Sequence, residues 1–143
     1  MSAGKPNRFV TAAEMIVEDA PWGPHEWLCR PDVTDAENLM LVRVRMPPGK
    51  GHAFHQHPAL EEVIYVVSGT AEQWVDRESR LLGPGETAHI PPGVIHGTYN
   101  AGEDTLVFLA ILSPAKFEGP AVVDMSTESP WSSMRAEEPL DGQ

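Results

Sequence analysis

The sequence has little of several residue types, and each shortage excludes a class of protein. The single cysteine, Cys29, allows no disulfide framework within the chain, which favours a cytoplasmic location. No apolar run approaches the roughly 20 residues that a membrane-spanning helix needs. The N-terminal residues also lack the apolar core of a signal peptide. We therefore expect a cytoplasmic protein that does not enter a membrane.

Positive charge is scarce as well. Lys and Arg number 10 against 21 Asp and Glu, which gives a formal net charge of -11 at pH 7. A chain this acidic repels the phosphates of nucleic acids and of anionic lipid headgroups. We therefore expect no nucleic-acid partner and no membrane surface.

The chain is rich in proline and glycine, the residues that interrupt helices and form turns. Its 143 residues are the usual size of one domain, and they include 14 prolines and 12 glycines. Frequent Pro and Gly favour short strands and turns over long helices, and many short strands imply an antiparallel sandwich or barrel. The sequence therefore predicts an all-β fold with a polar lead at 1–12, a single domain at 13–120 and a C-terminal tail at 121–143.

Local patterns place some of the strands. Residues 39–46 alternate with period 2, and one face carries Met40, Val42, Val44 and Met46. The apolar run at 105–114 predicts a strand buried on both faces. Ser68 and Gly69 lie between two strand-like segments and predict a tight hairpin turn. Near the C-terminus, Ser129 followed by Pro130 can begin one short helix.

Histidines and a glutamate form the most informative pattern. Residues i and i+2 of a strand point to the same face, so His55 and His57 project together. Pro58 favours extended geometry at His57. Glu62 would return on the next strand, and His96 would join if its strand lies beside the first. Such a set suits one divalent transition metal ion, with Mn, Fe, Co, Ni, Cu and Zn all compatible. The alternative is that the His–x–His pair binds nothing.

The spacing around these residues resembles the two motifs of the cupin superfamily. The first motif spans 49–69, with its fixed positions at Gly49, His55, His57, Glu62 and Gly69. The second motif spans 85–100, with its fixed positions at Gly85, Pro91, Gly93, His96 and Asn100. The resemblance implies a small single-domain cupin of the conserved-barrel type. It implies a jelly-roll β-barrel, or double-stranded β-helix, with one metal ion held by His55, His57, Glu62 and His96.

Other residues are candidates for the pocket wall. Ile64 shares strand parity with Glu62 and is expected inside the barrel near the ion. Glu72 corresponds to a position that faces the substrate in some cupin enzymes, so it is a candidate general base; its alternative is a solvated strand residue. Trp74 shares the parity of Glu72 and would form barrel wall or stack on substrate. His89 would face either the barrel mouth or the outside.

The two remaining histidines of the N-terminal half are expected outside the site. His52 has the opposite parity to His55 if its strand is regular, which favours a solvated loop position. His25 lies in the part of the chain least like the family and is expected at the surface.

The resemblance leaves three functions open. The first is a dioxygenase-type oxidoreductase with a mononuclear His3Glu site. The second is a non-redox isomerase, lyase or cyclase that uses the ion as a Lewis acid. The third is a cupin that binds a metal or small ligand without catalysis. Four intact ligands favour an enzyme acting on a small organic molecule, and the resemblance also implies a homodimer.

Overall fold

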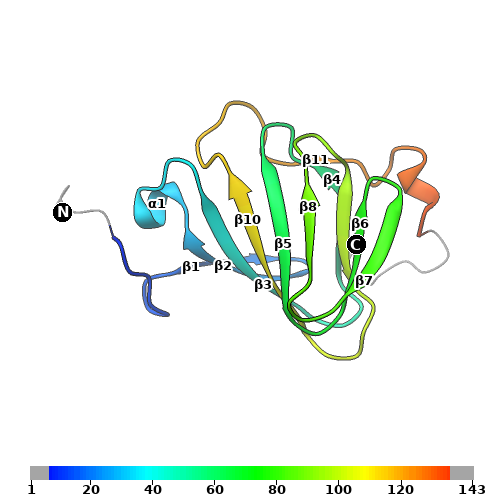
Figure 1. Ribbon diagram of the computed structural model, residues 1–143, viewed down its shortest axis with the longest axis horizontal. Helices are drawn as coiled ribbons and strands as arrows, with labels where there is room; N and C mark the ends of the chain where they lie inside the picture. The colour runs from blue at the N-terminus through cyan, green and yellow to red at the C-terminus, as the bar shows by residue number, and fades with distance from the viewer. Residues whose placement is uncertain (1–6, 136–143) are drawn as a thin grey trace.

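The structure, a computed structural model that describes residues 7–135, consists of two antiparallel β-sheets facing each other (Figure 1). The larger sheet has the strand order β1 (Ile16–Ala20), β2 (Gly23–Cys29), β3 (Met40–Met46), β10 (Leu106–Ser113), β5 (Glu61–Ser68) and β8 (Thr87–Ile90). The smaller sheet has the order β11 (Val123–Asp124), β4 (Gly51–Gln56), β9 (His96–Asn100), β6 (Ala71–Val75) and β7 (Glu78–Leu82). The predicted all-β jelly roll is confirmed.

From β3 onward the chain passes back and forth between the two sheets. Strands β3, β5, β8 and β10 belong to the larger sheet, while β4, β6, β7, β9 and β11 belong to the smaller one. Only β6 and β7 are consecutive strands of this region that pair with each other. This alternation winds the chain into the double-stranded β-helix, and it leaves the interior between the sheets for side chains from both.

The turn at Ser68 and Gly69 corrects one local prediction. It does not join a hairpin, because β5 and β6 lie in different sheets and do not pair. Gly69 has a positive φ of 85°, and a Cβ atom there would lie 2.8 Å from the carbonyl oxygen of Thr105. Only glycine lets the chain pass this close to the neighbouring backbone as it changes sheets.

The core lies between the two sheets and follows the predicted period of 2. The alternate residues of β3 are all buried there: Met40, Val42, Val44 and Met46. β5 contributes Ile64 and Val66 in the same way. Each fully buried side chain of this kind contributes about 1.5–3 kcal/mol of transfer free energy. Burial of these apolar side chains therefore determines which face of each strand points inward. Polar residues on the same face also enter the barrel.

β10 confirms the strand predicted over 105–114, with one difference. It lies at the centre of the larger sheet between β3 and β5. Its first three residues, Leu106 to Phe108, are all buried, whereas from Leu109 onward buried and half-buried residues alternate. The strand is therefore enclosed on both faces only at its start.

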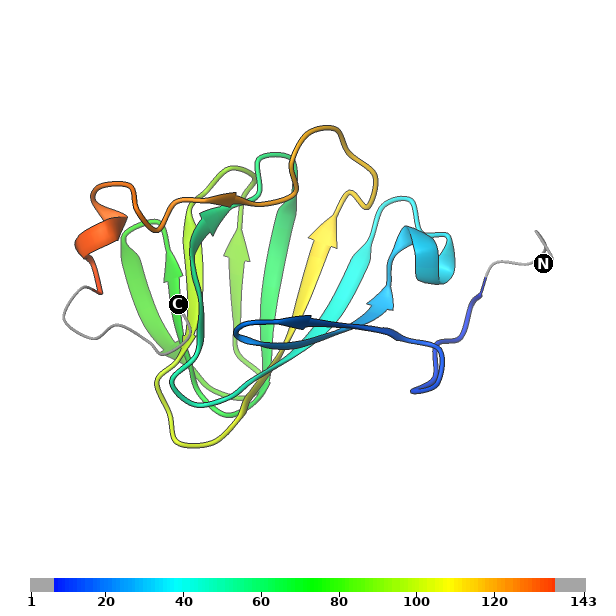
Figure 2. The same cartoon turned by 180° about the vertical axis from the view of Figure 1, so that it is seen from behind.

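The two ends of the described chain pack on opposite sheets. The β1–β2 hairpin extends the larger sheet beside β3, and residues 7–12 of the predicted lead contain no helix or strand. Beyond the predicted domain, β11 pairs with β4. The segment that contains β11 therefore lies against the smaller sheet (Figure 2). Positions 1–6 and 136–143 of the predicted lead and tail lie outside the described residues.

Helix is rare in the described part of the chain. One turn of α-helix, α1 (Pro31–Thr34), follows β2, and one turn of 3-10 helix, η1 (Trp131–Ser133), lies near the C-terminus. The predicted C-terminal helix is therefore a single 3-10 turn, with Pro130 rather than Ser129 as its N-cap. Among residues 7–135 no helix is long and apolar enough to span a bilayer.

Candidate metal centre and pocket

Four polar side chains from both sheets are buried at one place inside the barrel. His55 on β4 and His96 on β9 stand directly opposite each other in the strand pairing of the smaller sheet. His57 follows β4, and Glu62 enters from β5 of the larger sheet. Their exposed fractions are 3% for His55, 6% for His57, 5% for Glu62 and 1% for His96. Buried polar groups this close together must satisfy one another or share a partner.

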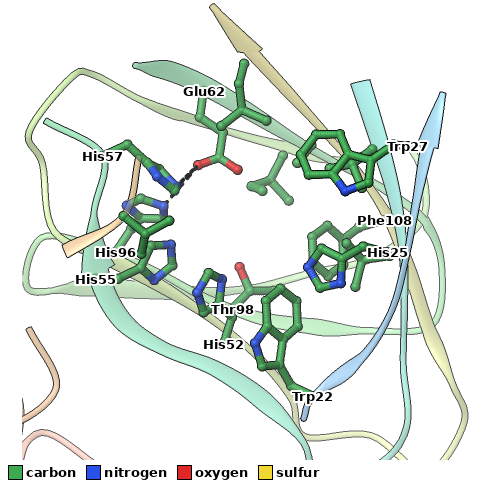
Figure 3. A pocket seen from close by; sticks show the side chains of 16 residues that line it. Trp22, His25, Trp27, His52, His55, His57, Glu62, His96, Thr98 and Phe108 are labelled. Carbon is green, nitrogen blue, oxygen red and sulfur yellow. Dashed lines mark hydrogen bonds and ion pairs between the residues drawn. The ribbon is translucent and has the colours of Figure 1, made fainter. Parts of the chain in front are cut away.

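The imidazole rings of the three histidines and the carboxylate of Glu62 point toward one another (Figure 3). Ring nitrogens of His55, His57 and His96 all lie within 4.8 Å of one another. Oε1 of Glu62 lies 3.0 Å from Nε2 of His96 and 3.1 Å from Nε2 of His57. The carboxylate therefore reaches two of the three imidazoles at the same point.

Backbone carbonyls fix the tautomer of every imidazole in this cluster. Nδ1 of His55 lies 2.7 Å from the carbonyl oxygen of Ala53. Nδ1 of His57 lies 2.8 Å from that of Ala121, and Nδ1 of His96 lies 3.0 Å from that of Val94. A carbonyl can only accept a hydrogen bond, so each Nδ1 carries the proton and donates it. When such a ring is neutral, its Nε2 presents a lone pair, as in metal-ligating histidines.

Electrostatics divide the cluster into one anion and imidazoles of unequal basicity. Burial raises the pKa of Glu62, but the adjacent imidazoles of His57 and His96 outweigh burial and lower the pKa to about 2. Burial lowers the pKa of His57, and its hydrogen bond to Glu62 more than reverses this, so the pKa is raised. Burial and the neighbouring imidazoles hold the pKa of His55 well below its ordinary value.

This donor set fits a transition metal ion. A carboxylate beside three inward-facing lone pairs is stable only with a positive charge among them, supplied by a proton or by a metal ion. Nitrogen donors with one carboxylate oxygen suit the first-row ions from Mn to Zn. His55, His57 and His96 therefore form a group that can hold a metal ion, with Glu62 placed to complete it.

The cluster forms one side of a pocket with a volume of about 260 Å³. Ile64 lines this pocket, as expected from its parity. The other lining residues, apart from the four in the cluster, are Trp22, His25, Trp27, Val42, Val44, His52, Thr98, Phe108, Ala110, Leu112 and Val122. The wall facing the cluster is thus largely apolar.

His52 lines the pocket, contrary to the prediction of a solvated loop. The pairing of β4 with β9 is irregular between His52 and His55, so the two residues do not alternate as in a regular strand. Their rings stack with centroids 3.6 Å apart, and Trp22 stacks on the other face of His52 at 4.1 Å. The sequence offers no signal for this irregularity.

His25 also lines the pocket, contrary to its predicted surface position. It lies on β2 opposite the inward-facing Val44 of β3, and Trp27 lies opposite Val42. Between them Glu26 points outward and forms an ion pair with Arg43. The period of 2 in β2 could have revealed this face, but only once β2 was known to pair with β3.

Glu72 and Trp74 are not among the residues that line the pocket, so neither a base at Glu72 nor substrate stacking by Trp74 is found there. β6 turns Gln73 inward, where it accepts a hydrogen bond from Thr98, so its neighbours face out. Glu72 accepts hydrogen bonds from Nε and Nη2 of Arg135 at 2.6 and 2.9 Å and from Nε1 of Trp74 at 2.7 Å. Burial raises the pKa of Glu72, but these partners outweigh it and lower the pKa. Glu72 therefore has no contact with the pocket through which to act as its base.

His89 also lies outside. It stands opposite Val63 in the pairing of β8 with β5, on the face away from the buried Ile64. Its Nε2 lies 2.6 Å from Oε2 of Glu61, and its side chain is 56% exposed. The prediction that His89 could line the substrate pocket is therefore wrong, and the alternative that it faces outward is right.

Fold and site together define a double-stranded β-helix barrel with an interior three-histidine cluster that can hold a metal ion. The family model of the cupin domain matches residues 42–112, which include all four residues of the cluster. The chain belongs to the cupin superfamily.

Three similar proteins illustrate its range. Mannose-1-phosphate guanylyltransferase of Escherichia coli (strain K12) is 29% identical over 103 residues, which cover 72% of this chain but only 20% of that protein. Dimethylsulfoniopropionate lyase DddQ of Ruegeria pomeroyi is 39% identical over 64 residues, covering 44% of this chain and 31% of the lyase. The structure of KdgF from Halomonas sp. has a TM-score of 0.67 and 25% identity, covering 77% of this chain and 96% of that one. The chain thus spans about a third or less of either curated relative.

Proposed function

We propose that this protein is a metal-dependent enzyme acting on a small organic molecule. His55, His57, Glu62 and His96 hold one divalent transition ion, and the substrate lies in the adjoining pocket. The observation that carries the proposal is the shared tautomer of the three imidazoles, whose Nδ1 atoms all donate to backbone carbonyls. That arrangement commits three Nε2 lone pairs to one point beside an ionised carboxylate.

The pocket supports catalysis by its position. A bound ion would supply Lewis acidity and, if it is a redox metal, electron transfer. The protein's own residues do the rest: the apolar wall formed by Val42, Val44, Phe108 and their neighbours keeps water away and holds the substrate against the cluster.

A dioxygenase-type reaction is the first candidate. It needs a redox-active ion and an apolar pocket. Among the pocket-lining residues within 7–135, Glu62 is the one carboxylate, and no lysine is present. Both atoms of O2 enter the product in such a reaction, so it needs no separate reductant. The outward position of Glu72 removes the candidate base that a non-redox reaction would have used.

His25 favours a second candidate, a non-redox lyase or isomerase. Burial lowers the pKa of His25, and the Gly23 carbonyl and the charge of Glu18 offset only part of the effect, so the ring is neutral at pH 7. Its Nδ1 lies 3.1 Å from the carbonyl oxygen of Gly23, so Nε2 keeps its lone pair. A neutral imidazole facing the cluster across the pocket can accept a proton from a metal-polarised substrate. The likeness to a lyase supports this candidate.

The experiment begins with the metal content of protein purified without added metal, measured by mass spectrometry. Oxygen uptake is then followed with small 1,3-diketones, for which we expect consumption that requires the bound ion. Turnover without oxygen uptake would favour the lyase or isomerase. Failure to retain metal after reconstitution with each first-row ion would refute the proposal. Metal binding without turnover of any tested substrate would favour a cupin that binds without catalysis.

A further inference from the structure

Apart from the metal cluster, the pocket has few charged side chains. Among its lining residues in the described chain, none is lysine or arginine, and Glu62 is the one carboxylate. A bound anion would therefore meet no cationic side chain once it extends past the cluster. Removing a charge from water without a partner is unfavourable, so the wall selects against charged ends on a ligand.

Size sets a second limit. The volume of about 260 Å³ lies slightly below the roughly 300–1,000 Å³ typical of ligand pockets. The side facing the cluster is built from aliphatic and aromatic side chains of the larger sheet: Val42, Val44, Ile64, Phe108, Ala110 and Leu112. The pocket therefore accepts a small molecule that is mostly apolar.

His25 is the polar exception in this wall. It comes from β2 of the larger sheet, and Figure 3 shows it across the pocket from His55, His57 and His96. Its ring is held from two directions, since Nδ1 donates to the Gly23 carbonyl and the ring of Trp22 packs against it in a T-shaped arrangement with ring centroids 4.3 Å apart. No residue of the described chain hydrogen-bonds to its Nε2, so this acceptor is available to a ligand.

We propose that the pocket selects an uncharged, mostly apolar small molecule that carries a hydroxyl or N–H group donating to Nε2 of His25. The inference rests on the proposed function, because it assumes that the reacting end of the molecule faces the metal cluster. His25 then fixes the distal end and acts as a specificity-determining residue. Dicarboxylates and phosphosugars fit this wall poorly, because their second charged group would face apolar side chains.

The test uses three ring compounds of similar size: benzyl alcohol, toluene and benzoate. Their affinities for the full-length protein are measured by ligand-observed NMR, first in metal-free protein so that benzoate cannot coordinate an ion. We expect benzyl alcohol to bind more tightly than toluene by about 3- to 10-fold, the effect of one net hydrogen bond. We expect benzoate to bind at least tenfold more weakly than benzyl alcohol.

Variants then assign the preference to one side chain. His25→Phe keeps an aromatic ring but removes the acceptor, so benzyl alcohol and toluene should bind it equally. His89→Phe is the matched control, because His89 is exposed and outside the pocket, and it should keep the wild-type preference. Equal binding of benzyl alcohol and toluene by the wild type, or tighter binding of benzoate, would overturn the proposal without recourse to any variant.

Metal content measured on the same samples separates this inference from the function on which it rests. Selectivity for benzyl alcohol in a protein that cannot be loaded with metal supports the pocket preference and refutes the proposed enzyme. Full metal loading without that selectivity refutes the pocket preference and leaves the metal centre standing. Selectivity that persists in metal-loaded protein supports both.

Discussion

Glu62 and Glu72 are two carboxylates held on opposite sides of the barrel wall. Glu62 points inward from β5 to imidazoles, whereas Glu72 points outward from β6 to Arg135. In both cases the partners outweigh burial and lower the pKa of the carboxyl group. The difference lies in the partner: a guanidinium is always charged and binds no metal, while an imidazole can exchange its proton for an ion.

The outer carboxylate has a structural role. The two contacts from Arg135 to Glu72 form a complete pair, and the guanidinium also lies over the ring of Tyr99 with its central carbon 3.9 Å from the ring centroid. This pair anchors the C-terminal segment to the smaller sheet. The inner carboxylate has partners that remain able to bind something else, which is what a metal centre requires.

The largest expected effect comes from removing an inner imidazole. His96→Ala deletes one nitrogen donor and leaves Glu62 with one fewer partner, so metal affinity should fall by more than about 100-fold, beyond the loss typical of a second-shell partner. Affinity is measured by competition with a chromophoric chelator. His89→Ala is the control and should bind metal like the wild type. Unchanged affinity in His96→Ala would refute its role as a ligand.

A smaller effect is expected from neutralising the inner carboxylate. Glu62→Gln keeps the size of the side chain but removes the charge that attracts the ion, so affinity should fall by about 10- to 100-fold. The same chelator titration applies, with Glu61→Gln as the matched control because Glu61 is the exposed neighbour paired with His89. If both variants bound metal equally well, Glu62 would not be a ligand.

Neutralising the outer carboxylate should separate stability from metal binding. Glu72→Gln loses the charged pair with Arg135, whose side chain is 14% exposed, and should lower the free energy of unfolding by about 1 kcal/mol while metal affinity stays unchanged. Urea unfolding measures the first quantity. Glu78→Gln, which breaks a fully surface pair with Arg80, serves as the control and should cost less. A loss of metal in Glu72→Gln comparable to that in Glu62→Gln would erase the distinction between the two carboxylates.

The smallest effect is the pH dependence of that outer pair. The folded pKa of Glu72 is lowered from 4.5, so its contribution to stability is fully present above pH 4.5 and is lost as the pH falls through the lowered value. The stability difference between wild type and Glu72→Gln should therefore be constant near neutral pH and shrink in acid. Urea unfolding at several pH values measures it. A difference that grew in acid would contradict the assigned pairing.

Much of the fold and the composition of the cluster were predictable because they depend on spacing and on the period of 2. The alternation of β3 and β5 placed Val42, Val44 and Ile64 inside the barrel. The same reasoning suggested that His55, His57, Glu62 and His96 could meet. Strand alternation involves residues close in sequence, and the cluster residues have a fixed spacing from glycines and prolines in turns.

The missed features depend on how distant strands pair. A pocket position for Glu72 requires it to point inward from β6, but the burial of Gln73 against Thr98 sets the opposite parity. His52 faces the pocket because β4 is irregular, and His25 does so because β2 pairs with β3. Neither pairing can be recognised from the local sequence, so His25 and His52 could not be assigned to the pocket before the structure was known.

The carbonyl of Ala121 that orients His57 comes 64 residues later in the chain. The ribosome must synthesise Ala121 before its carbonyl can hold the His57 ring in this tautomer. A nascent chain that ends before residue 121 would contain all four heads of the cluster and still present one of them unsecured. The orientation of His57 is thereby completed only after all four residues of the cluster have been synthesised.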